Sequence, residues 1–344
     1  MLRPFSDHFP ICLESLVAAR GKAPFRFENM WLEHEGFSDL IREWWGELQV
    51  QGFASYVVAS KLKHLKEKLK VWNRVTFGDI RVRKLKLLDS INLLDLKEES
   101  SGLVSEELEQ RSEAKAEWAK VCTFEEISWR QKSRALWLQA GDRNTKYFHR
   151  IASLHRKFNS LSTIEVEGTR YDTLPAMKDA IFGFYRSLFT ESEVWRPGVD
   201  DLSLTQLRQI DKETIELPFN EEEISRVLFE CCGDKSPGPD GMTMAFIQSN
   251  WATLREDVLK LFDEFYYSGK FVASLNSTFI GLISKKVGAV NLKNFRPISL
   301  VGSMYKLLSK VLARRFRGVI STLISENQKR FCWRASDSGC SAHC

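Results

Sequence analysis

The residues whose types and spacing most clearly indicate a binding site form a short run rich in proline and glycine. The run is Asp234-Lys235-Ser236-Pro237-Gly238-Pro239-Asp240-Gly241. Two prolines and two glycines in eight residues predict a rigid, exposed loop. The glycines would let a backbone approach closely, and Lys235 would bind a phosphate. An ordinary surface turn is the alternative interpretation.

A second group of basic residues follows a predicted strand at 278–284. Lys285 and Lys286 come directly after this strand, and Arg296 is held by the proline that follows it. Such side chains can form charge-assisted hydrogen bonds to a triphosphate or to the backbone of a template. Without further context, this is a basic hairpin of unknown use.

The weaker candidates are metal ligands and base-stacking rings. Cys340, His343 and Cys344 have a spacing that could suit zinc, but no second cluster accompanies them, so chance composition is favoured. The tryptophans could stack on bases, although core packing is the favoured interpretation. These tryptophans are Trp44, Trp45, Trp118, Trp129 and Trp137.

The charges are segregated along the chain, whose net charge is +5. Basic residues dominate 61–86 and 285–317, whereas acids collect at 95–126 and 191–223. Segregation of this kind creates local positive surfaces that attract polyanions. Solvated helix faces that happen to be basic are the alternative.

The elements that must position these residues begin with helices over roughly 39–126. Val58, Leu62, Leu65, Leu69 and Trp72 have the spacing of a seam that packs on another helix. Gly78 and Asp79 interrupt this pattern, and 100–102 form a predicted turn. We expect a long helical hairpin with a basic and an acidic arm. Salt-bridged arms and an exposed basic face are both compatible with the sequence.

The second half of the chain mixes short strands with helices. A strand pair is predicted at 164–166 and around Tyr171, followed by a helix at 174–189. Asn220 and Glu223 form a capping box before a helix that stops at Gly233. Further helices are predicted at 245–267 and 304–323, and the strand at 278–284 is expected to be buried. The fold class is therefore α+β and mostly helical.

Cysteine usage and hydropathy bear on the compartment. Seven cysteines at irregular positions do not form a disulfide framework, which favours a reducing environment. No signal peptide is recognisable at the start, and the longest uncharged stretch, 271–284, is too short and too polar to cross a bilayer. We expect a soluble intracellular protein, nuclear or cytoplasmic, without a membrane partner.

Taken together, several runs resemble the reverse transcriptase of plant LINE-type (non-LTR) retrotransposons. They lie in the order of that family: Ser6 to Ile11, Lys132 to His149, Lys235 to Gly241, Leu282 to Lys286 and Asn294 to Leu308. One departure is Ser284, where the family usually has proline. Five ordered motifs make a coincidence implausible.

The resemblance implies roles for individual residues. Asp7 and His8 would be the dyad of an apurinic-type endonuclease, here a remnant without its metal-binding carboxylate. Lys285, Lys286 and Arg296 would contact the triphosphate of the incoming nucleotide. The expected contacts to the RNA template or DNA are Lys235, Gly238, Asp240, Gly241, Lys306, Lys310 and Arg314.

The resemblance also implies a domain order. Residues 1–20 would be the endonuclease remnant and 21–157 a helical linker. Residues 158–328 would be the N-terminal extension and fingers of a right-hand polymerase, and 329–344 an unrelated tail. Fingers without a palm should leave an apolar surface exposed.

The family joins nucleotides with two Mg²⁺ ions held by palm aspartates, which would follow Gln328. Residues 329–344 do not resemble those motifs, so we expect neither polymerase nor endonuclease activity, no bound metal or cofactor, and retained non-specific nucleic-acid binding. One alternative is a reverse transcriptase that is active once a palm completes it. Another is a helical interaction module that uses the Val58–Trp72 seam. The oligomeric state is not predictable.

Overall fold

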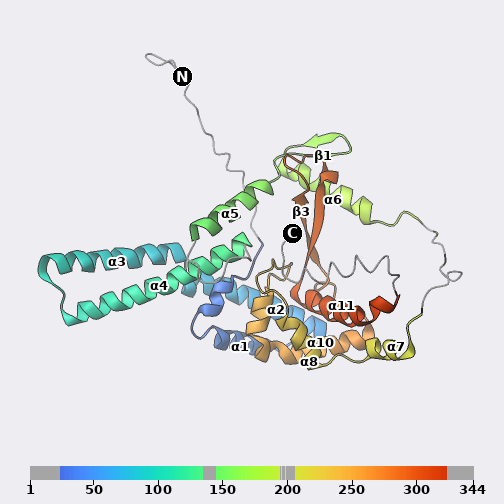
Figure 1. Ribbon diagram of the computed structural model, residues 1–344, viewed down its shortest axis with the longest axis horizontal. Coiled ribbons are helices and arrows are strands. Elements are labelled where there is room, and N and C mark those ends of the chain that lie inside the picture. The colour runs from blue at the N-terminus through green and yellow to red at the C-terminus, as the bar shows by residue number, and fades with distance from the viewer. Residues whose placement is uncertain (1–23, 135–144, 194, 196–197, 199–205, 324–344) are drawn as a thin grey trace, which may run out of the picture.

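The computed structural model describes residues 24–134, 145–193, 195, 198 and 206–323. It has three parts: a helical body, a long two-helix arm, and a β-ribbon accompanied by a small helix and hairpin (Figure 1). The predicted α+β, mostly helical fold class is confirmed. Among the described helices, none is long and apolar enough to cross a membrane. The described cysteines Cys122, Cys231 and Cys232 do not form disulfide bonds with one another.

The body contains most of the hydrophobic core. The predicted seam on α2 is buried, with Leu65 and Leu69 fully so, and it packs within the chain against α10 and α1. The seam is therefore not available to a partner protein. The elements of the body are η1 (Asn29–Glu33), α1 (Phe37–Glu47), α2 (Ala54–Trp72), η2 (Asn73–Phe77), α7 (Gln209–Glu216), α8 (Glu221–Phe229), α9 (Met244–Ser249), α10 (Trp251–Ser268) and α11 (Ser303–Leu323).

The N-terminal segment belongs to this core although the sequence analysis assigned it to a linker. Phe27 is fully buried, and its ring lies 5.1 Å from that of Trp31 and 4.9 Å from that of Phe246. One hydrophobic cluster joins these residues to α2, α8, α10 and α11. The predicted boundary at 157/158 therefore does not separate two cores, because both segments contribute to the same one.

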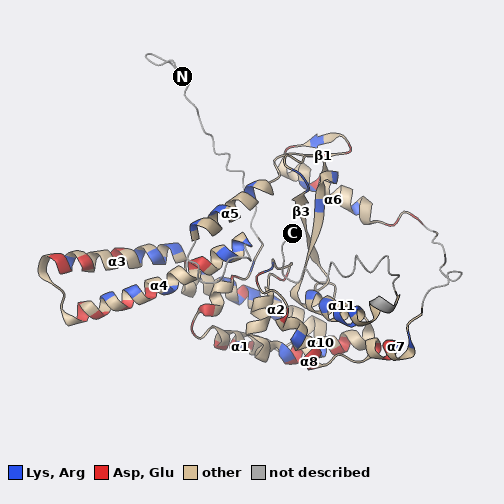
Figure 2. Cartoon of the chain, in the orientation of Figure 1, with Lys and Arg blue, Asp and Glu red and all other residues tan. Residues whose placement is uncertain are grey.

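The arm consists of α3 (Ile80–Ser101) and α4 (Ser105–Ser133), joined at Gly102, whose φ is 77°. Ion pairs cross between the helices: Lys84 and Glu125 at 2.5 Å, Arg83 and Glu117, and Arg111 with both Asp95 and Glu98. Figure 2 shows that α3 is basic near the body and acidic near the tip of the arm. Of the two alternatives, the structure has salt-bridged arms.

The ribbon pairs β3 (Thr278–Ser284) with β4 (Phe295–Val301), antiparallel, with Thr278 opposite Val301 and Ser284 opposite Phe295. Beside its tip lie α6 (Leu174–Phe189), η3 (Leu292–Asn294) and the hairpin of β1 (Ile164–Val166) and β2 (Thr169–Tyr171). The helix α5 (Thr145–Phe158) leads from α4 to this region. A second, small core of Tyr185, Leu292 and Phe295 holds the parts together.

Two predictions for these elements were wrong in detail. Phe279 and Ile280 are 41% and 43% exposed, so β3 is not a buried strand. A two-stranded ribbon has no further strand to cover it, so Phe279 and Ile280 stay exposed. The helix predicted at 245–267 is divided at Asn250 into α9 and α10.

Candidate nucleic-acid interface

The proline- and glycine-rich loop packs against the base of the ribbon. Pro237 and Gly238 are buried, so the prediction of an exposed loop was wrong. A Cβ added to Gly238 would lie 2.4 Å from the carbonyl carbon of Val301 and 2.6 Å from the nitrogen of Gly302. Glycine is therefore required because two stretches of the chain's own backbone meet here.

Asp240 connects the loop to α11. Its Oδ2 accepts a hydrogen bond from the backbone N–H of Ser303, the first residue of α11, and its Oδ1 accepts one from Met242 N at 3.3 Å. A carboxylate here satisfies a free helical N–H and faces the positive end of the helix dipole. Burial raises the pKa of Asp240, and the hydrogen bonds from Ser303 and Met242 and the charge of Lys306 oppose that rise.

The N-terminal segment holds the loop from the other side. Gly241 has a φ of 77°, and its carbonyl accepts a hydrogen bond from Phe27 N at 2.8 Å. Asn29 donates through Nδ2 to Asp234 Oδ1 at 2.7 Å and accepts from Thr243 Oγ1 at 2.8 Å. Sequence reasoning missed these contacts; the aromatic residues at 24–31 were the available signal. The loop is thus fixed between two distant segments.

One lysine of this fixed loop, Lys235, and two lysines of α11, Lys306 and Lys310, form a cationic group in which Lys306 interacts electrostatically with the other two. Lys235 and Lys310 are exposed, and Lys306 is half-buried with its Nζ 3.4 Å from the carbonyl oxygen of Ser236. Burial lowers the pKa of Lys306, while the nearby Asp240 and Cys231 raise it. We call Lys235, Lys306 and Lys310 the loop–α11 surface.

The other residues assigned to nucleic-acid contact have internal partners. Arg314 forms an ion pair with Glu230, and its neighbour Arg315 donates to Glu223 and to the carbonyl oxygens of Ile215, Leu217 and Pro218. Gly238, Asp240 and Gly241 hold the loop in place, as described above. Their contact with nucleic acid stays a prediction, and their observed role is structural.

The predicted triphosphate ligands lie at the far end of the ribbon. Lys285 and Lys286 follow the last residue of β3, and Arg296 is paired with Ile283 one position from the tip. Lys285, Lys286 and Arg296 are all exposed, and Lys285 donates through Nζ to the carbonyl oxygen of Lys293 at 2.8 Å. At about 3.3 Å per residue, the tip is roughly 20 Å from the base. The structure therefore separates the two predicted groups.

A basic surface that the charge analysis missed lies on α5. Its sequence contains Lys146, Arg150, Arg156 and Lys157 and no acid, and all four side chains are exposed. The apolar side packs on α4, where Phe148 is fully buried and the rings of His149 and Trp129 are 4.4 Å apart. The helix carries basic and no acidic residues in Figure 2. Its amphipathic spacing was the overlooked signal.

Several predicted sites fall outside the described residues: Asp7, His8, Cys340, His343, Cys344 and Trp137. Within the described residues, no group of three or more His, Cys, Asp or Glu side chains could hold a metal ion. Trp45 is a core residue, and its Nε1 donates to Asp257 at 2.8 Å.

Comparison with known proteins supplies one relative. The chain is 28% identical, over 344 residues, to a transposon TX1 uncharacterized 149 kDa protein of Xenopus laevis. The match covers 95% of this chain, which spans 26% of the length of that relative. No family model matches the sequence. The chain is thus similar over almost all of its length to part of a transposon protein.

Proposed function

We propose that this chain is part of the polyprotein of a LINE-type (non-LTR) retrotransposon and contributes nucleic-acid-binding surfaces to its reverse transcriptase. The loop–α11 surface contacts the backbone of the RNA template or of DNA. Lys286 and Arg296 at the tip of the ribbon, with Lys285 beside them, bind the triphosphate of the nucleotide. The similarity to a transposon protein supports this assignment at the level of the element.

The observation that carries the proposal is the convergence of lysines on a fixed loop. Lys235 is separated from Lys306 and Lys310 by about 70 positions in the sequence, yet Lys306 lies against the loop and interacts electrostatically with both Lys235 and Lys310. The turn is held by Asp240 and by the Phe27–Gly241 hydrogen bond, so the cations are attached to rigid backbone. Preorganised cations on such a scaffold suit phosphate contacts that fix the register of a nucleic acid.

In this assignment the described segment binds template and nucleotide but does not itself join nucleotides. Joining nucleotides requires two metal ions with acidic ligands, and the described residues include no cluster suited to a metal. Mg²⁺ would be held by palm aspartates of the complete family enzyme. The segment contributes template and triphosphate binding to that enzyme.

The salt dependence of binding tests the proposed phosphate contacts. The full chain should bind single-stranded RNA at low salt. The double variant Lys235→Gln/Lys310→Gln should lower the magnitude of the slope of log affinity against log salt concentration by about 1.4, which is roughly 0.7 for each lost phosphate contact. Fluorescence anisotropy over a salt series measures the slope. Lys260→Gln, an exposed lysine on α10, is the matched control and should leave it unchanged. Absence of binding at low salt would refute the proposal.

Primer extension tests the absence of bond formation. We expect no templated incorporation by the full chain with primer, RNA template, deoxynucleotides and Mg²⁺, because the carboxylate ligands of the metals are not among the described residues. Incorporation above that of a heat-denatured sample would instead establish the alternative of an active polymerase.

The alternative of a helical interaction module required an accessible Val58–Trp72 seam, and the structure buries this seam. Its seam residues Val58 and Leu62 are 1% and 3% exposed inside the body. Oligomers that persist in high salt, together with a lack of nucleic-acid binding, would revive that alternative through some other surface.

A further inference from the structure

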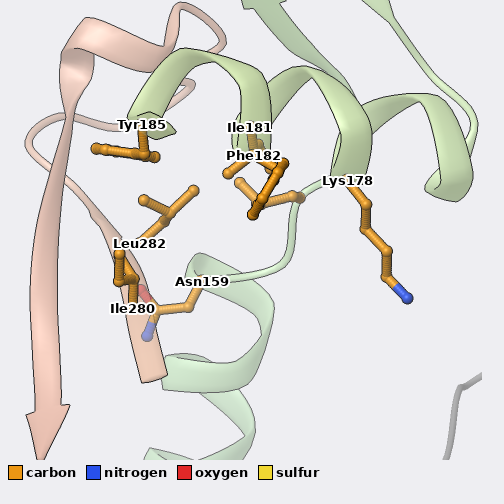
Figure 3. A pocket seen from close by; sticks show the side chains of 8 residues that line it. Asn159, Lys178, Ile181, Phe182, Tyr185, Ile280 and Leu282 are labelled. Carbon is orange, nitrogen blue, oxygen red and sulfur yellow. The ribbon is translucent and has the colours of Figure 1, made fainter. Parts of the chain in front are cut away.

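An open groove of about 430 Å³ lies between α6 and β3 (Figure 3). Its volume falls within the range of roughly 300–1,000 Å³ typical of small-ligand sites. Ile280 and Leu282 line it from the ribbon, and Phe182 and Tyr185 line it from α6. Leu282 is opposite Pro297 and Ile283 is opposite Arg296, so the groove opens on the ribbon face that does not carry Arg296. It is therefore separate from the triphosphate ligands.

The groove offers an aromatic ring to a flat apolar ligand. Phe182 is 67% exposed although it is a large apolar side chain, and Ile280 beside it is 43% exposed. Tyr185 is 6% exposed and belongs to the small core, so it closes the groove from within. Burial raises the pKa of Tyr185, and its phenol stays neutral. A rigid apolar floor with an exposed ring at its edge suits a stacked ring system.

Cations flank this apolar space. Lys178 lies one helical turn before Phe182 on α6, and both residues line the groove. On the other side the lining residue Asn159 directly follows α5, whose last turn contains Arg156 and Lys157. In Figure 3 the end of α5 lies beneath the groove, and the amine of Lys178 extends away from its apolar floor. An apolar peptide segment would leave these cations without counterions, whereas a nucleotide combines a flat base with an anionic phosphate.

We propose that this groove holds one unpaired nucleobase of a single-stranded nucleic acid, stacked on Phe182, with the adjoining phosphates paired to Lys178 and to the basic last turn of α5. The inference rests on the proposed function, because it requires that the chain bind nucleic acid. It adds a base-stacking site to the phosphate contacts of the loop–α11 surface. Stacking of this kind tolerates any base, because every base has a π-face.

The test compares ordinary and abasic single-stranded oligonucleotides of equal length, bound to the full chain. The wild-type chain should prefer the base-containing strand, and Phe182→Ala should weaken binding of that strand roughly 5- to 150-fold, as expected for the loss of one base–aromatic stack. Phe182→Ala should leave binding of the abasic strand unchanged. Phe182→Tyr keeps a ring and should preserve the preference. Leu188→Ala is the matched control, since Leu188 lies on the same helix, is 60% exposed, and does not line the groove.

The outcomes separate this inference from the proposed function. If the wild-type chain binds both strands equally, or if Phe182→Ala and Leu188→Ala weaken binding equally, the groove does not take a base, and the loop–α11 surface is unaffected. If the wild-type chain binds neither strand at low salt, the proposed function fails as well. Lys178→Gln provides a second readout, because it should lower the salt slope by about 0.7 for one lost phosphate contact. Thermal melts should be unchanged in every variant, because the altered side chains are exposed.

Discussion

Asp240 is the residue on which the geometry of the loop depends most directly. Its carboxylate receives N–H groups from both Ser303 and Met242 and therefore fixes the loop to the first turn of α11. Burial raises its pKa above the ordinary value of 3.8, so the ionised form is disfavoured in the folded protein relative to the unfolded chain. The cost of ionisation is absent below about pH 3.8 and develops as the pH rises through the folded-state pKa.

Substitution of Asp240 separates its hydrogen bonds from its charge. Asp240→Asn keeps an oxygen that can accept from Ser303 N and removes the charge, so we expect its stability relative to wild type to improve as the pH rises above about 3.8. Asp240→Ala loses the cap and should destabilise the fold by about 1–3 kcal/mol. Urea unfolding of the three proteins across a pH series measures both effects. Equal destabilisation by Asn and Ala at neutral pH would contradict the assigned role of burial.

Single-residue roles were only partly predictable from the sequence. The exposure of Lys235 and Lys310 follows from their charge, and the structure agrees. Gly238 was predicted to admit a ligand's backbone, but it admits that of Val301. A glycine in a tight loop indicates that another group approaches the backbone closely. The sequence does not identify that group, because here it is a residue more than 60 positions away in the chain. Periodicity and local turn chemistry contain no information about such a pair.

Among the elements, the arm shows how far pattern reasoning extends. The hairpin and its turn at 100–102 were predictable, because a break in helical periodicity marks a turn. It was not predictable whether Arg83 pairs with Glu117 or faces solvent, since this depends on the register of α3 against α4.

For β3 the sequence pattern gave a wrong prediction, because its apolar run predicted a buried strand. Burial of a strand depends on what covers it, and a two-stranded ribbon leaves Phe279 and Ile280 exposed.

The arm should respond to salt more than the body does. Its helices contain few buried apolar residues, Ile91 and Val121 among them, and are joined by partly exposed ion pairs such as Lys84–Glu125 and Arg111–Asp95. At about 1 M salt the Debye length falls to roughly 3 Å and screens exposed pairs. We expect amide hydrogen exchange in α3 to accelerate between low and high salt, while exchange in α10 stays constant. Equal exchange in α3 at both concentrations would show that its apolar contacts suffice.

At the scale of the whole molecule, segments far apart in the sequence share one core. Phe27 from the N-terminal segment, Leu65 from α2 and Phe262 from α10 are all fully buried in the same cluster. The family resemblance implied a linker over residues 21–157, and a resemblance in motif order contains no information about these contacts. The mostly helical class was predictable from periodicity, whereas the joint core was not.

The shared core makes the N-terminal segment essential to stability. Phe27→Ala removes a fully buried ring that contacts Trp31 and Phe246, and we expect a loss of about 3–5 kcal/mol. Phe53→Ala is the control, because Phe53 is 78% exposed and its replacement should change stability by less than about 0.5 kcal/mol. Urea midpoints of the two variants measure the difference. Similar midpoints would mean that the segment is dispensable.

The arm also has a geometric consequence. Its 22-residue helix α3, at about 1.5 Å per residue, spans roughly 33 Å, and the turn at Gly102 is its outermost point. The helix α3 runs outward from the body and α4 runs back to it, so equal insertions in the two helices would lengthen the arm without changing how the arm joins the core. An insertion of seven residues in each would move the tip outward by roughly 10 Å. The length of the arm can therefore be varied by insertion, and Val104 beside the turn, which is 62% exposed, is a suitable position for a fluorophore that reports what lies near the tip.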